Sequence, residues 1–118
     1  MTHFTVNRYG DVSDSNVLAI IRDAIHSFSE GIDDFIIVTP DPPVRGSIYM
    51  QAAAPTKRPK NHRGSIPVEI RFEFPDGTAR HCQYWTSDKD EVYRIFADYI
   101  EKEILPDLAK FEDMPDLL

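Results

Sequence analysis

Residues 68–85, VEIRFEFPDGTARHCQYW, restrict the fold of this chain more than any other stretch. Apolar side chains at Val68, Ile70, Phe72 and Phe74 alternate with charged ones at positions 69, 71 and 73. Strict alternation of this kind is typical of a half-buried β-strand. The PDG that follows is a turn sequence, so residues 78–86 are expected to return as the antiparallel partner strand.

The turn also predicts how the two strands pair. A type I turn within FPDGT, closed by a left-handed Gly77, pairs Ile70 with Cys82. Successive side chains of a strand point to opposite faces, so Cys82 joins the apolar face and His81 the polar one. A two-residue loop at DG would reverse this and place His81 among apolar side chains. We therefore expect a buried, unreactive Cys82 that forms no catalytic pair with His81.

The remaining elements are predicted around this hairpin. Apolar residues at helical spacing predict one helix at about 14–29 and another that begins after Ser87 or Asp88 and reaches Ile104. Pro106 fits the first turn of a short third helix. Further strands are expected at three places: 4–9, which is weak, 35–39 and 47–53. The predicted fold is therefore α+β, with an N-terminal helix, an antiparallel four-stranded meander, and one or two C-terminal helices on one face of the sheet.

Length and composition predict one soluble domain. A chain of 118 residues fits a single domain, in which we expect a frayed tail at about 112–118. The longest apolar run, FIIV at 35–38, is far shorter than the roughly 18 residues of a membrane helix. The start, MTHFTVNRYGD, lacks the basic and apolar regions of a signal peptide, and the single cysteine forms no internal disulfide. A cytoplasmic protein without a membrane partner is the expectation.

Charge separates the candidate partners. The formal net charge of −7 argues against general nucleic-acid binding and favours a basic protein partner. A flexible loop predicted at about 54–65 is the exception, because it contains four basic residues and no acid: Lys57, Arg58, Lys60 and Arg63. These cations could bind a phosphate or another polyanion, weakly and in a salt-sensitive way, or the loop could simply be mobile and solvated.

No motif in the sequence predicts a catalytic residue, a cofactor or a metal ion. Carboxylate pairs such as Asp33 and Asp34 are explained as loops, caps or solvated faces, and the five glycines form no phosphate-binding loop. Histidine and cysteine spacings match no metal site. The best candidate surface is the outer face of the hairpin: Glu69, Arg71, Glu73, His81, Gln83 and Trp85. An exposed Trp85 beside charges would suit a protein partner, although it could equally pack under a helix.

Four segments resemble small, acidic bacterial proteins of the polymorphic-toxin immunity type: FIIVTPDPP, IYMQAA, VEIRFEFPDG and TSDKDEVYRIFADYIEKEILPDLAKFEDM. The resemblance spans most of the chain from Phe35 onward. It implies a cytoplasmic, single-domain α+β protein that neutralises a toxin by occluding its site.

Three hypotheses about function follow. The first is a non-enzymatic protein-binding domain, immunity-like, for a basic partner that is attracted electrostatically. The second is a polyanion-binding module that acts through residues 57–63. The third is an enzyme of unidentified class. A homodimer formed through an uncovered edge strand also stays open.

Overall fold

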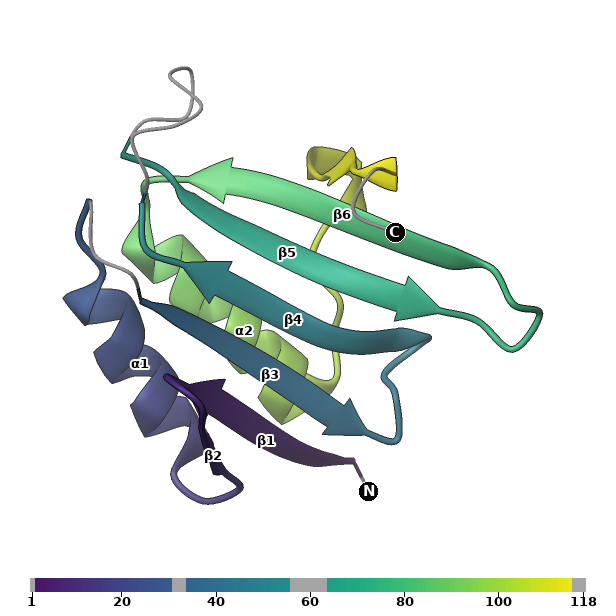
Figure 1. Cartoon of the computed structure of the whole chain (residues 1–118), viewed down its shortest axis with the longest axis horizontal. Helices are drawn as coiled ribbons and strands as arrows, with labels where there is room; N and C mark the ends of the chain where they lie inside the picture. The colour runs from purple at the N-terminus through teal and green to yellow at the C-terminus, as the bar shows by residue number, and fades with distance from the viewer. Residues whose placement is uncertain (1, 31–33, 56–63, 116–118) are drawn as a thin grey trace.

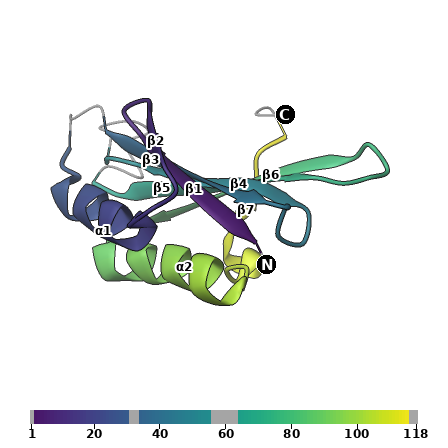
Figure 2. The same cartoon turned by 90° about the horizontal axis from the view of Figure 1, so that it is seen from below.

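The computed structural model of the chain describes residues 2–30, 34–55 and 64–115. These residues form one antiparallel sheet with the strand order β2-β1-β3-β4-β5-β6-β7 (Figure 1). The elements in chain order are β1 (His3–Arg8), β2 (Asp11–Ser13), α1 (Val17–Ser27), β3 (Phe35–Asp41), β4 (Ser47–Ala53), β5 (Ile66–Glu73), β6 (Ala79–Thr86), α2 (Lys89–Lys102), a 3₁₀ helix η2 (Leu108–Lys110) and β7 (Glu112–Asp113). Both α-helices lie on the same face of the sheet (Figure 2).

The predicted α+β class is confirmed, but the sheet is larger than the predicted four-stranded meander. The four consecutive strands of that prediction are β3 to β6, and β1, β2 and β7 extend the sheet at both edges. β1 lies where the weak strand at 4–9 was expected, and β2 was not predicted, so two strands precede the first helix. β2 and β7 contain three and two residues. Strands this short have no alternation to detect, and their pairing with a longer neighbour defines them.

The hairpin of β5 and β6 has the predicted register. Ile70 pairs with Cys82, and Phe72 pairs with Arg80. The Phe74 N–H donates to the Thr78 carbonyl at 2.9 Å, and Gly77 has a φ of 88°. Cys82 is fully buried with the apolar face, as predicted.

Both helices end about two residues earlier than predicted, and only α1 also begins later. α1 starts at Val17, because residues 11–13 belong to β2 and Asn16 turns the chain with a φ of 54°. α2 starts where expected, since the Asp88 carboxylate accepts hydrogen bonds from the N–H groups of Asp90 and Glu91. The predicted third helix is the single turn η2. Among the described residues, no helix is both long and apolar enough to cross a membrane.

The core lies between the two helices and the sheet. Its largest fully buried side chains include Tyr99 and Phe96 of α2, Ile21 and Ile25 of α1, and Met50 of β4. One hydrogen bond lies inside this core, between the Tyr99 hydroxyl and the Ser47 Oγ at 2.7 Å. Both residues are fully buried, so this contact joins α2 to the sheet without access to water.

Residues 112–114 are bonded to the edge of β6 instead of forming a frayed tail. The Met114 N–H donates to the His81 carbonyl at 2.8 Å, and Asp113 accepts a 2.7 Å hydrogen bond from the Nε of Arg80. Phe111 stacks on Tyr84 with 5.3 Å between ring centres. The prediction was wrong for residues 112–114 because the free edge of β6 offers backbone partners that a sequence does not display. Residues 116–118 and the middle of the basic loop, residues 56–63, lie outside the described residues.

Candidate functional site

One face of the sheet has no helix over it in the described part of the chain (Figures 1 and 2). All six residues of the predicted surface lie on this uncovered face: Glu69, Arg71 and Glu73 on β5, and His81, Gln83 and Trp85 on β6. The register pairs Trp85 with Pro67, on the face opposite the helices, where it is half-buried. The alternative in which Trp85 packs under a helix is therefore wrong.

The centre of this face is a hydrogen-bonded polar cluster. The Nε2 of His81 lies 2.8 Å from Oε1 of Glu69, and the Gln51 side chain donates to the other oxygen of Glu69 at 2.9 Å. The Tyr49 ring meets the His81 ring edge-on, with 6.2 Å between centres. The sequence could not reveal Gln51 and Tyr49 as members, because they lie on β4, one strand away from the hairpin.

His81 is less accessible than a surface position requires. It faces away from the helices, as predicted, yet only 4% of it is exposed. Glu69, Tyr49 and the backbone contact of Met114 surround it. The expectation that His81 belongs to an accessible binding surface is therefore wrong, and its Nε2 instead contacts the Glu69 carboxylate.

Charged residues around Tyr49 form one electrostatic group. The Arg71 guanidinium contacts the Glu73 carboxylate at 3.3 Å. Burial raises the pKa of Tyr49, Arg71 opposes the rise, and the carboxylates of Glu69 and Glu73 add to it. These side chains restrain one another, so the middle of the uncovered face is a fixed arrangement of charges.

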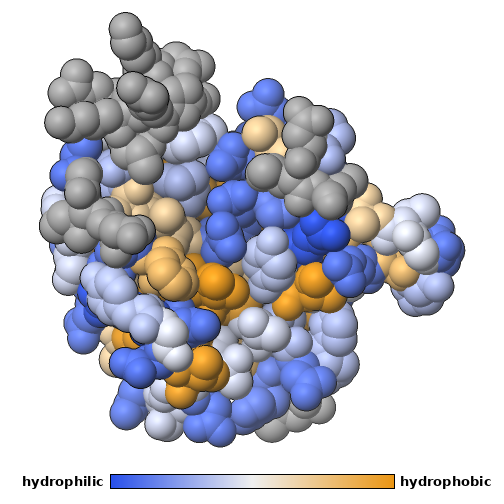
Figure 3. All heavy atoms as spheres, viewed as in Figure 1, coloured by the Kyte–Doolittle hydropathy of each residue, from blue (hydrophilic) through white to orange (hydrophobic). Residues whose placement is uncertain are grey.

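An apolar row borders the polar cluster on the same face. Phe35 pairs with Ala53, and Pro67 pairs with Trp85. Phe35 and Ile37 are half-buried, whereas the alternate residues Ile36 and Val38 are fully buried under the helices. An unbroken apolar run such as 35–38 is typical of a strand covered on both faces, but the helices cover only one face of β3. Figure 3 shows apolar side chains among polar ones over the middle of this face.

Within the described ranges, His81 and Cys82 do not come together as a catalytic pair, and no metal site is assembled. Cys82 and His81 lie on opposite faces of β6. Burial, and then the 3.4 Å hydrogen bond from its Sγ to Asp113, raise the pKa of the Cys82 thiol to about 11. Across the described residues, no group of three or more histidine, cysteine, aspartate or glutamate side chains could hold a metal ion. The predicted anion-binding residues lie outside the described ranges: Lys57, Arg58, Lys60 and Arg63.

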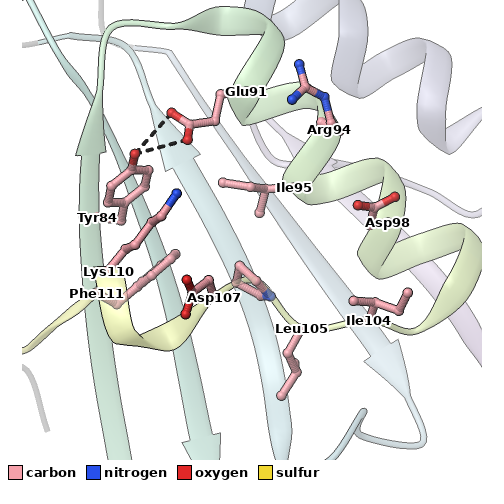
Figure 4. A pocket seen from close by; sticks show the side chains of 11 residues that line it. Tyr84, Glu91, Arg94, Ile95, Asp98, Ile104, Leu105, Asp107, Lys110 and Phe111 are labelled. Carbon is pink, nitrogen blue, oxygen red and sulfur yellow. Dashed lines mark hydrogen bonds between the residues drawn. The ribbon is translucent and has the colours of Figure 1, made fainter.

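A cleft on the other side of β6 was not predicted at all. It encloses about 250 Å³ between β6, α2 and the C-terminal segment (Figure 4). The Tyr84 hydroxyl donates to both oxygens of Glu91, at 3.1 and 3.0 Å. Three stretches of chain separated in sequence form its walls, and no local spacing connects them.

Comparison of the chain with protein-family models, curated proteins and solved structures finds no match.

Proposed function

We propose that this chain is a non-enzymatic protein-binding domain that contacts its partner through the uncovered face of the sheet. One observation carries the proposal: half-buried apolar side chains, including Phe35 and Ile37, lie next to a fixed polar cluster on a face without a helix. Solvent-facing sides of antiparallel sheets are normally polar. Apolar residues gathered on such a face mark a surface used for interaction.

The polar cluster supports this function through preorganisation. Gln51 and His81 hold the Glu69 carboxylate, and Arg71 and Glu73 pair on the same strand. Side chains that are already held in one geometry lose little conformational entropy when a partner binds. Fixed charges also select against partners of the wrong charge pattern. The apolar row would contribute affinity and the cluster specificity.

The proposed partner is a basic protein. The formal net charge of −7 attracts such a partner over distance and raises its association rate at low salt. The resemblance to immunity proteins of polymorphic toxins is consistent with this reading, because such a domain occludes a toxin. We propose a toxin domain encoded by a neighbouring gene as the partner.

The test is co-expression with that toxin domain, followed by affinity measurement at low and high salt. Ile37→Ser and Gln83→Arg change the uncovered face, whereas Ala19→Arg places the same new charge on the exposed side of α1. We expect the two face variants to weaken binding at least about tenfold and Ala19→Arg to leave it nearly unchanged. Circular dichroism checks that each variant folds. The absence of a complex at low salt, or equal binding by all variants, would refute the proposal.

A further inference from the structure

The cleft beside α2 has apolar walls and an aromatic side. Ile95 of α2 and Leu105 of the following segment form part of its wall, and Figure 4 shows the Ile95 side chain directed toward the cleft. Phe111 stacks on Tyr84, with 30° between the ring planes. Ile104 at the rim is 49% exposed. These surfaces suit a ligand with an apolar stem.

The polar groups of the cleft favour a positive charge. Three acids line it, Glu91, Asp98 and Asp107, against two bases, Arg94 and Lys110. The Tyr84 hydroxyl donates to both Glu91 oxygens. A carboxylate has about four lone-pair sites, so Glu91 can accept further hydrogen bonds. Burial and the contact with Glu91 raise the pKa of Tyr84, so the phenol stays a neutral donor. The surrounding segment from Asp88 to Asp113 contains nine acids and four bases, which extends the negative field.

We infer that this cleft binds an arginine side chain of a protein partner. The methylene stem would lie along Ile95 and Leu105, and the guanidinium would reach the Glu91 carboxylate beside the Phe111 ring. Arginine suits this site better than lysine, because its planar group stacks on aromatic rings and donates two parallel hydrogen bonds to a carboxylate. This site lies on the helix side of β6 and its existence does not depend on the uncovered face.

The Lys110 amine would compete with a cationic ligand for the cleft, so substitution of Lys110 tests the charge of that ligand. Its side chain lines the cleft, and Figure 4 shows its amine directed toward Tyr84 and Glu91. If the cleft binds a cation, removing the Lys110 charge strengthens binding. If the cleft binds an anion, removing that charge weakens binding. The sign of this one change separates the two chemistries.

The experiment titrates the whole chain, labelled with ¹⁵N, with N-acetyl-arginine methylamide. The neutral isostere N-acetyl-citrulline methylamide and the corresponding lysine derivative are titrated in parallel. We expect saturable shifts at Ile95 and Phe111 for the arginine probe, weaker binding of lysine and no saturation with citrulline. Lys110→Gln should tighten binding of the arginine probe roughly twofold, and Glu91→Gln should weaken it about fivefold. Glu91→Gln keeps an oxygen that can accept from Tyr84.

The matched control is Glu101→Gln, which removes the same charge from an exposed position of α2 outside the cleft. It should change the affinity for the arginine probe far less than Glu91→Gln does. Equal effects of both changes, equal binding of citrulline, or weaker binding by Lys110→Gln would overturn the inference. Ile37→Ser should leave the probe affinity unchanged, so failure of this site and failure of the sheet-face proposal are distinguishable.

Discussion

His81 of β6 and Glu69 of β5 are joined across the strand pair by a 2.8 Å contact between Nε2 and Oε1. An ionised carboxylate only accepts hydrogen bonds, so a neutral His81 ring must have its proton on Nε2. The Nδ1 atom of the same ring is buried and has no hydrogen-bond partner within the described residues. The pair therefore determines the tautomer of a buried imidazole on the face that we propose for binding.

We predict that neutral His81 is in the Nε2–H form, which long-range ¹H–¹⁵N spectra of the ring measure directly. Glu69→Ala should lower the free energy of unfolding by about 1–3 kcal/mol, because it leaves a buried N–H without an acceptor. Glu69→Gln retains an acceptor oxygen and should lower it less. Detection of the Nδ1–H form, or equal losses in both variants, would contradict this account of the pair.

Cys82 should resist thiol reagents in the native protein. Its side chain is fully buried, and the raised pKa, about 11, leaves almost no thiolate at pH 8. We expect labelling that becomes fast only in denaturant. A Cys82→Ala/Ser29→Cys variant, with its thiol at an exposed position, is the positive control. Rapid reaction of native Cys82 would mean that the hairpin register is reversed.

Stability should fall in alkaline solution. Burial raises the pKa of Cys82 from 9.0 to about 11, and burial raises that of Tyr99 from 10.0 to about 12 against the opposing effect of its hydrogen bond with Ser47. Both groups stay neutral up to a higher pH in the folded state than in the unfolded state. Their contribution to the free energy of unfolding is therefore complete below pH 9 and is lost as pH rises toward 11 and 12. Urea midpoints from pH 7 to 11 test this. Cys82→Ala should flatten the decline between pH 9 and 10; an unchanged decline would exclude the thiol as its source.

The buried hydroxyl pair of Ser47 and Tyr99 should show an asymmetric response to substitution. The Ser47 hydroxyl donates to the Val44 carbonyl, so the Tyr99 hydroxyl donates to Ser47. Ser47→Ala leaves a buried phenol without a partner and should lower the free energy of unfolding by about 1–3 kcal/mol. Tyr99→Phe removes the donor itself and should lower it by about 1 kcal/mol. In urea unfolding, the double variant should be more stable than the sum of the two losses predicts. Simple additivity would argue against the bond.

Alanine substitutions at Gly46 and Gly77 should distinguish destabilisation by backbone strain from destabilisation by steric crowding. Both have a φ of 88°, but a Cβ at Gly46 would lie 2.5 Å from Cε1 of Phe74, whereas nothing lies within 4 Å at Gly77. Gly77→Ala should destabilise by about 1 kcal/mol through strain alone. We expect roughly 2 kcal/mol for Gly46→Ala, measured by urea unfolding. In a Phe74→Ala background the two losses should become equal; a persistent difference would show another source.

Features that depend on neighbours along the chain were predictable. Alternation identified β5, the turn residues of FPDGT determined its pairing with β6, and from these followed the faces of His81 and Cys82. The Asp88 cap likewise located the start of α2. Each of these features depends on dihedral preferences or hydrogen bonds within a few residues, and such local constraints are visible in the sequence.

Features that depend on segments far apart in the chain could not be predicted from the sequence. The sequence placed His81 on the polar face, but its burial comes from Tyr49 two strands away and from the chain at Met114. The half-exposure of Phe35 and Ile37 follows from both helices packing on one side of the sheet. The cleft needs β6, α2 and the C-terminal turn together. Local pattern thus assigned each side chain to a face, whereas packing between segments far apart in the chain determined what covers that face, because burial is a property of the assembled layers.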